Sequence, residues 1–167
     1  MIFQHTLPQL LRDDKTQTRR LVRDGEIALY NPSGAITAVR TASGRLKWAV
    51  GRTYAVQPGR GQAAVARIRL TGIRLERVQD ITEADAADEG CPRCTACGGG
   101  GGYGYAYDEN GAHVVTCLVC QGSGVETAPR VWYAETWDTI HTRPGTRCAD
   151  NPQVWVLDFE LVKEEQQ

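Results

Sequence analysis

The sequence predicts an α+β fold, a small mixed β-barrel of antiparallel strands with short helices at its ends. Two observations predict this class: segments with strand patterns outnumber helical ones, and most of the strand segments are short. The length of 167 residues is a third observation, since it suits one domain with a core better than two ordinary domains. We therefore expect a single domain over residues 1–167.

The chain begins with a helical pattern. Leu7, Leu10 and Leu11 recur at i, i+3 and i+4, and Pro8 is tolerated in a first helical turn. The polar stretch that follows, DDKTQTRRL at 13–21, is expected to be a helix exit or a loop.

Strand patterns fill the next part of the chain. Residues 35–41, 46–50 and 53–57 are rich in strand-forming types and are separated by turns that contain Gly or Pro. Apolar residues alternate with arginines along 64–78, where Gly72 is expected to mark a bulge.

Two further helices and a final strand complete the expected fold. Thr82 and Asp85 have the spacing of a capping box, and Gly90 is the expected left-handed stop of that helix. A second helix begins at Pro129 and has apolar residues at i, i+4 and i+7: Tyr133, Trp137 and Ile140. The last strand carries four large apolar residues on one face: Trp155, Leu157, Phe159 and Leu161.

Charge is divided unevenly along a chain whose net charge is only −1. Residues 1–79 hold 14 Lys or Arg and 5 Asp or Glu, whereas residues 80–167 hold 5 and 15. Such a division can form one basic face for an anionic ligand, or the fold can interleave the halves so that the charges pair. Neither a secretory start nor a long apolar run is present, so we expect a soluble, cytoplasmic protein that makes no membrane contact.

Residues 91–127 break the composition and are expected to form an insertion within the domain. They hold five of the six cysteines and a run of five glycines. Two CxxC pairs have the spacing of a four-cysteine zinc site, in which each tight turn offers two thiolates: Cys94, Cys97, Cys117 and Cys120. A segment so rich in glycine buries little apolar surface, so a structural zinc ion is the expected source of its order. Disulfides in an exporting host and a free thiol cluster are the alternatives.

Other residues of the insertion leave choices open. Cys91 forms a third CxxC with Cys94 and can displace one ligand, and His113 can substitute as a ligand, although we expect it on the surface of a hairpin. Asn110 and Gly111 form a strong hairpin-turn signal. Three tyrosines alternate ahead of this turn and either stack on bases or pack within the hairpin: Tyr103, Tyr105 and Tyr107.

Three segments together carry a family resemblance. KTQTRR at 15–20, ITEADAADEG at 81–90 and the terminal WDTIH...NPQVWVLDFELV resemble the ASCH family of PUA-like barrels, especially its small phage-borne members. The resemblance covers most of residues 1–90 and 129–163 and leaves the cysteine insertion out. It implies a β-barrel with a cleft for nucleic acid or a nucleoside.

Some small bacterial ASCH proteins are amidohydrolases that remove acyl groups from the exocyclic amine of cytidine. Their K-T-x-T-x-R motif and their glutamate near a helix end are matched in this chain, so the resemblance implies four site residues: Lys15, Thr18 as the nucleophile, Arg20 and Glu89. Larger members of the family are instead thought to bind RNA or to act as coactivator modules.

These residue types suit amide hydrolysis. Thr18 supplies a hydroxyl, and Lys15 can accept its proton if burial and the neighbouring Arg19 and Arg20 lower the pKa of the lysine. Glu89 lies at an expected helix C-terminus, where the dipole disfavours a negative charge and favours an acid that protonates the leaving amine. Arg20 is placed to hold the developing acyl oxygen or a substrate phosphate.

Three functions remain open. The first is hydrolysis of an acylated cytosine nucleoside or a related amide by Thr18, Lys15 and Glu89. The second is a non-catalytic RNA or single-stranded DNA module, and the third is a zinc-stabilised interaction or phage-assembly protein whose protein partner the sequence does not name. Three arginines are expected to contact the substrate: Arg19, Arg20 and Arg67. The plain alternative is a solvated basic turn in which Thr18 caps a local bend.

Overall fold

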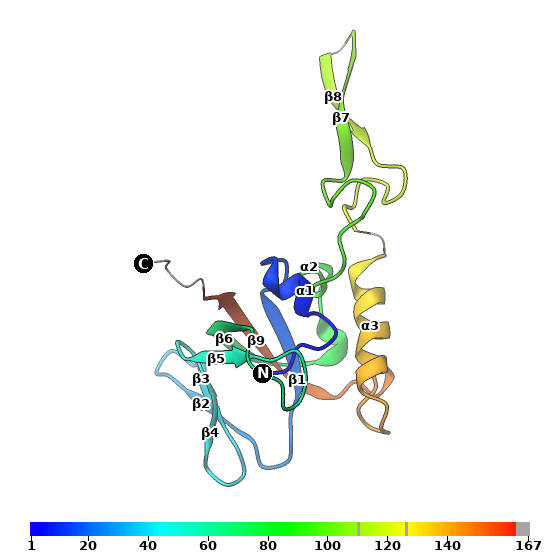
Figure 1. The fold of residues 1–167 in the computed structure, drawn as a ribbon. Helices are drawn as coiled ribbons and strands as arrows, with labels where there is room; N and C mark the ends of the chain where they lie inside the picture. The colour runs from blue at the N-terminus through cyan, green and yellow to red at the C-terminus, as the bar shows by residue number, and fades with distance from the viewer. Residues whose placement is uncertain (110, 126, 163–167) are drawn as a thin grey trace, which may run out of the picture.

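Two antiparallel sheets form the body of the protein in the computed structural model, which describes residues 1–109, 111–125 and 127–162 (Figure 1). The first sheet has four strands in the order β1 (Gln17–Leu21), β9 (Gln153–Leu161), β6 (Ala66–Arg77) and β5 (Thr53–Val56). The second has three strands in the order β2 (Ile27–Tyr30), β3 (Ile36–Arg40) and β4 (Leu46–Ala49).

Within the described residues, three α-helices and two short 3-10 helices accompany the sheets. The α-helices are α1 (Leu7–Leu11), α2 (Glu83–Asp88) and α3 (Pro129–Ile140), and the 3-10 helices are η1 (Val78–Asp80) and η2 (Cys148–Asp150). None of the helices in the described part of the chain has the length and apolar character that a membrane crossing requires.

Strand β9 separates two apolar cores, because its successive side chains point to opposite faces. Leu157 and Phe159 face a core that also contains Val39 and Trp48 of the second sheet. Val154 and Val156 face a second core, which α2 and α3 complete with Ala86, Tyr133 and Trp137. This arrangement confirms the predicted α+β class of antiparallel strands flanked by short helices.

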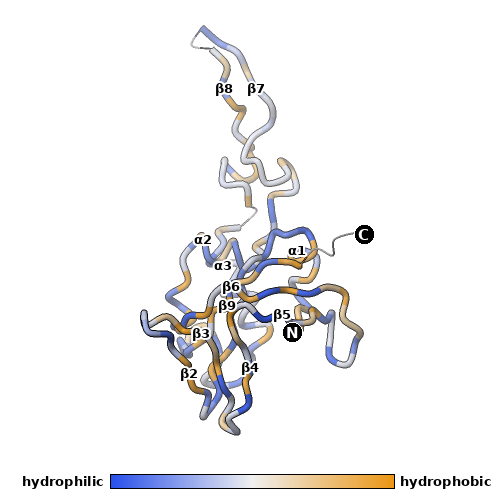
Figure 2. The backbone as a smooth tube through the Cα atoms, turned by 90° about the vertical axis from the view of Figure 1, so that its left-hand side faces the viewer, coloured by the Kyte–Doolittle hydropathy of each residue, from blue (hydrophilic) through white to orange (hydrophobic). Residues whose placement is uncertain are grey.

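The cysteine segment forms a hairpin of β7 (Gly102–Asp108) and β8 (Gly111–Thr116). Figures 1 and 2 show from two directions that this hairpin projects away from the sheets. Its strands carry few buried side chains, since every residue of β8 is exposed. Asn110, half of the expected turn, lies outside the described residues.

Local sequence signals account for most of the elements. The predicted bulge at Gly72 is present as a register shift against β9, where an added Cβ would lie 2.7 Å from Asp158 Oδ2. The predicted capping box of α2 is also present, because the Thr82 hydroxyl accepts a hydrogen bond from the backbone N–H of Asp85 at 3.0 Å.

The expectation of a loop across residues 13–21 was wrong for 17–21, which form β1. This strand pairs with β9 from Gln17 opposite Asp158 to Leu21 opposite Val154. Gln17, Thr18 and Arg19 are buried, and the side chains of Gln17 and Arg19 have polar partners inside the fold that take the place of water. β2 was not expected either, and Ile140, expected on the apolar face of α3, is 48% exposed.

Candidate functional site

Lys15 and Glu89 are in contact at the end of α2, and Thr18 of β1 lines the same cavity as both. All three residues are buried, with exposed fractions of 3%, 2% and 5%. The Lys15 ammonium donates to Glu89 Oε2 at 2.6 Å and also to the backbone carbonyl of Glu89. The lysine and the glutamate are 74 positions apart in the sequence, so the fold creates this contact.

The chain reversal after α2 explains how Glu89 reaches Lys15. Glu89 is the C-terminal cap of α2, and Gly90 follows with φ +96°, a conformation that favours glycine. A Cβ on Gly90 would lie 3.1 Å from the Cβ of Gln9 and 3.3 Å from the Cβ of Lys15. Glycine is therefore needed for both the turn and the close approach of the helix end to Lys15.

A cavity of about 570 Å³ opens beside these residues. Lys15, Thr18 and Glu89 line it together with Arg20. Its remaining walls are strongly aromatic, with seven such side chains: Phe3, His5, Trp48, Trp132, Tyr133, Trp137 and His141. Nucleobases stack well on surfaces of this kind.

Burial lowers the pKa of Lys15 from its ordinary value. The nearby guanidinium groups of Arg20 and Arg19 lower it further, whereas the negative charge of Glu89 opposes the shift. The direction agrees with the one expected from sequence, and it brings the lysine closer to the neutral form that can accept a proton.

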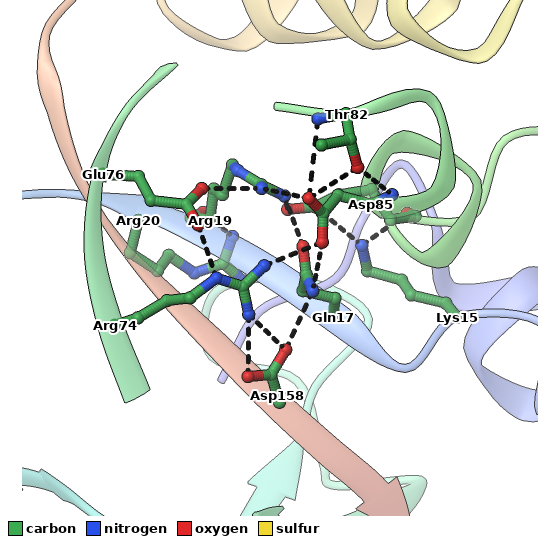
Figure 3. Close-up of polar contacts among 10 residues, drawn as sticks. Lys15, Gln17, Arg19, Arg20, Arg74, Glu76, Thr82, Asp85 and Asp158 are labelled. Atoms are coloured by element: carbon green, nitrogen blue, oxygen red, sulfur yellow. Dashed lines mark hydrogen bonds and ion pairs between the residues drawn. The ribbon is translucent and has the colours of Figure 1, made fainter. Parts of the chain in front are cut away.

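Arg19 lies at the centre of a buried polar network rather than free in the cavity (Figure 3). Its side chain has no exposed surface, and its guanidinium lies 3.0 Å from Glu76, 3.3 Å from Glu89 and 3.7 Å from Asp85. It also donates to Gln17 Oε1 at 2.5 Å. Arg19 was expected to contact substrate; it lines the cavity, but its two terminal nitrogens are directed to these side chains, and one of them is Glu89.

The network extends through Arg74 and joins the basic part of the sequence, residues 1–79, to the acidic part, residues 80–167. Arg74 lies 2.5 Å from Glu76, 2.7 Å from Asp85 and 2.9 Å from Asp158. Cations of the first half of the chain thus pair with acids of the second half. Of the two arrangements expected from the charge division, pairing between the two parts of the chain is the one found in this network, rather than a single basic face.

Arg20 and Arg67 differ in their positions. Arg20 lines the cavity, where its guanidinium lies over the Phe3 ring at 5.3 Å from the centroid. Arg67 is exposed on β6, in register with Ala55 of β5, and is not among the residues that line the cavity. The structure therefore does not bring Arg67 to this site, contrary to our expectation.

Tyr133 is a cavity residue that sequence reasoning placed only in the core. It is 5% exposed, and its hydroxyl has no hydrogen-bond partner among the residues that the structure describes. Burial raises the pKa of this phenol well above its ordinary value, so it remains a hydrogen-bond donor. The apolar spacing of Tyr133 and Trp137 signalled a buried helix face, but spacing alone does not separate a core from a cavity wall.

The four cysteines of the two CxxC pairs form a second site, in the segment that carries the hairpin. Their sulfur atoms all lie within 4.8 Å of one another. The Sγ atoms of Cys94 and Cys117 are 3.9 Å apart, and those of Cys97 and Cys120 are 3.7 Å apart. These separations are far longer than a disulfide bond, and tetrahedral zinc with Zn–S bonds of about 2.3 Å places its sulfurs at about 3.8 Å. The arrangement therefore fits a zinc ion.

Glycines allow the two cysteine turns to pack closely. An added Cβ on Gly101 would lie 2.5 Å from the carbonyl oxygen of Gly122, and one on Gly124 would lie 2.5 Å from that of Gly99. The backbone N–H of Gly124 also donates to the Cys120 sulfur at 3.4 Å.

Two candidate ligands lie outside the cysteine cluster. Cys91 is buried with its sulfur 3.8 Å from the carbonyl oxygen of Thr127, and burial raises the pKa of its thiol to about 11. His113 is exposed on β8, with Nδ1 3.6 Å from Asp108. The cluster is made by the two CxxC pairs that the spacing indicated.

Comparison with known proteins gives matches to solved structures only. No protein-family model and no curated protein matches the chain. An ASCH domain from Lactobacillus crispatus JV V101 aligns with 15% identity and a TM-score of 0.41, over 93% of this chain and 69% of that one. Protein EF3133 from Enterococcus faecalis V583, of the DUF984 family, aligns with 14% identity and a TM-score of 0.47, over 92% of this chain and 64% of that one. The chain is thus similar in fold to a solved ASCH domain structure.

Proposed function

We propose that the aromatic cavity binds an acylated cytidine-type nucleoside and hydrolyses the amide on its exocyclic amine. One observation carries the proposal: Glu89, which is distant in sequence from Lys15 and Thr18, lines one cavity with them, and all three match the amidohydrolase motif. The cavity volume of about 570 Å³ lies within the range of about 300–1,000 Å³ for small-molecule sites.

The Lys15–Glu89 contact prepares both proton transfers. Movement of the proton from the Lys15 ammonium to the Glu89 carboxylate across their hydrogen bond of 2.6 Å produces a neutral amine and a carboxylic acid together. No net charge is created in the buried site, which keeps the cost of this exchange low.

In the proposed reaction, Thr18 Oγ1 attacks the amide carbonyl carbon while its proton passes to Lys15 Nζ. The C–N bond then breaks, and the exocyclic amine leaves with the proton of Glu89. The acyl group remains on Thr18 as an ester. A water molecule cleaves this ester, giving the carboxylic acid and restoring the threonine hydroxyl. Arg20 is a cavity cation that can serve either the oxygen that becomes negative in each step or a phosphate of the substrate.

The aromatic walls supply the recognition that the chemistry needs. Half-buried Trp132 and buried Trp48 offer ring surface for stacking. The unpartnered hydroxyl of Tyr133 suits a carbonyl or ring nitrogen of the base, because a buried donor without a partner carries a cost that a ligand removes.

Turnover of cytidine acetylated on its exocyclic amine tests the proposal. Thr18→Ala should lower the rate by at least about a thousandfold, since the nucleophile is lost. Thr71→Ala is the matched control, because Thr71 is an exposed threonine of β6 that does not line the cavity. Equal turnover by wild type and Thr18→Ala would contradict the proposal.

The aromatic walls also support a second candidate, a site that holds an unpaired base without chemistry. Tight binding of cytosine-containing single strands by wild-type protein, with no turnover of the acylated nucleoside, would assign the cavity to nucleic-acid binding instead.

For the insertion, we propose a structural zinc ion held by Cys94, Cys97, Cys117 and Cys120. Four thiolates fill a tetrahedral site, so this ion would supply folding energy and no open position for substrate. A cluster of four thiolates that holds zinc is typical of a reducing compartment, so we propose a cytoplasmic location.

A further inference from the structure

The cavity contains more positive charge than its own acid can balance. Four permanently or normally cationic side chains line it, against one carboxylate, Glu89: Lys15, Arg19, Arg20 and Arg23. Lys15 and Arg19 both contact Glu89, and Arg19 also pairs with Glu76. The charges of Arg20 and Arg23 remain to be balanced.

Neither of these arginines is joined to a carboxylate by an ion pair within the part of the chain that the structure describes. Arg20 donates to the backbone carbonyls of Arg19 and Ile2, at 3.1 and 3.0 Å, and its side chain is half-buried. These two bonds and the Phe3 ring hold the guanidinium in place while other donors stay unused. Arg23 is exposed at the edge of the same cavity.

The strand geometry orders these cations relative to the nucleophile. Thr18 and Arg20 are two positions apart on β1, so their side chains leave the same face about 7 Å apart. Arg23 follows just after β1 ends at Leu21. Figure 3 shows Lys15 and Arg20 on opposite sides of the buried network. A ligand whose reacting group lies at Thr18 would therefore extend along β1 toward two uncompensated arginines.

We infer that the ligand of this cavity carries a phosphate, which Arg20 and Arg23 bind, so that the substrate is a nucleotide or a nucleotide unit of RNA rather than a free nucleoside. The inference rests on the proposed function for the orientation of the base. Arginine suits this role because its planar fork can donate two hydrogen bonds to one phosphate.

Binding of unacylated ligands tests the inference without requiring hydrolysis. Three of the four tryptophans line the cavity, so quenching of tryptophan fluorescence reports binding: Trp48, Trp132 and Trp137. We expect cytidine 5′-monophosphate to bind at least about tenfold more tightly than cytidine, with a preference that weakens as sodium chloride is raised. Arg23→Gln should reduce this preference by about tenfold, and Arg20→Gln should do the same if its circular dichroism spectrum shows a native fold.

Arg60→Gln is the matched control, because it removes an exposed arginine that does not line the cavity. The dinucleotide cytidylyl-cytidine, which has an internal phosphodiester and no terminal phosphate, separates the two sources of phosphate. Binding as tight as that of the monophosphate assigns the site to RNA, and weaker binding assigns it to free nucleotides. Equal affinity for cytidine and its monophosphate, or equal effects of Arg23→Gln and Arg60→Gln, would overturn the inference. A phosphate preference without any turnover would leave the inference standing and remove the hydrolytic proposal.

Discussion

Lys15 combines two properties that rarely occur together in a lysine. It is buried, and its closest charged partner is a carboxylate whose second oxygen contacts another cation, Arg19. Burial lowers the pKa of Lys15, so the neutral amine forms at lower pH than it does in an exposed lysine.

The pH dependence of turnover follows from this shift. The pair must hold one proton, because neutral Lys15 accepts the Thr18 proton while Glu89 gives its own proton to the leaving amine. Loss of that proton leaves no acid, so kcat/KM should fall as pH rises through the lowered pKa of Lys15. Lys15→Arg keeps a positive charge beside Glu89 but cannot lose a proton in this range, so its activity should fall by at least about a hundredfold at every pH tested.

Lys47→Arg provides the control for that change. Lys47 pairs with Glu26 and is not among the residues that line the cavity, so the same substitution should leave the pH profile unchanged. A Lys15→Arg protein with the wild-type profile would exclude the lysine as proton acceptor.

Single residues also show where sequence reasoning stops. Lys15, Thr18 and Glu89 were singled out because they form a motif and a helix end. The ion pairs of Arg19 were not foreseen, since Glu76 and Asp85 come from β6 and α2 and the motif contains no information about these two acids. Arg67 alternates with apolar residues along β6. That alternation predicts that the Arg67 side chain is exposed, but it does not predict whether the side chain lies near the cavity.

At the scale of elements, the C-terminus of α2 is the part that the sequence predicts best. A capping box and a left-handed glycine both act within a few residues, so their signals are local. β1 could not be predicted in the same way. Its residues are polar, and they form a buried strand only because β9 and the acids of α2 and β6 surround them.

Gly90→Ala tests the link between the end of α2 and the site. Alanine at φ +96° is strained by about 1–2 kcal/mol, and its Cβ would also crowd Gln9 and Lys15. We expect a loss of about 2 kcal/mol or more in the free energy of unfolding, together with loss of turnover as Glu89 shifts.

Gly44→Ala separates strain from crowding. Gly44 has φ +78° with no atom within 4 Å of an added Cβ, so only the strain of about 1 kcal/mol should appear, and turnover should be retained. Equal losses of activity in the two alanine variants would argue against a specific role for the Gly90 turn.

The zinc-binding element can be tested by metal content. Cys120→Ser should lower bound zinc below one ion per chain and expose residues 91–127 to proteases, because little apolar surface orders this segment without metal. Cys148→Ser changes a half-buried cysteine far along the chain and should retain zinc. Full zinc content in Cys120→Ser, or no zinc in the wild-type protein, would contradict the proposed site.

At the scale of the whole molecule, the buried network unites the two charge halves of the chain. The sequence shows a basic first part and an acidic second part, and it leaves open whether they separate or interleave. Arg19 and Arg74 show that they interleave around β1, β6, β9 and α2. The pairing of these charges depends on the order of the strands in the sheet, and a count of charges along the sequence gives no information about that order.

Removal of Arg19 should therefore destabilise the whole fold. Arg19→Met leaves Glu76, Asp85 and Glu89 without their shared cation, and loss of one partner of a buried ion pair typically costs about 3–5 kcal/mol. Arg69→Met removes an exposed arginine that pairs with Glu160 at 3.3 Å, and such a pair contributes at most about 1 kcal/mol. Guanidinium unfolding of the two variants measures the difference. Comparable losses would show that the network contributes no more than a surface pair.

The central claim, that Thr18 is a nucleophile served by Lys15 and Glu89, is tested most directly by trapping the acyl group on the protein. Wild-type protein is mixed with cytidine acetylated on its exocyclic amine, quenched in acid during the first turnover, digested and analysed by mass spectrometry. We predict one acetyl group on Thr18 in the wild-type protein, and none on that peptide in Thr18→Ala. Acetylation at another residue, or unchanged turnover in Thr18→Ala with no acetylated peptide, would contradict the account.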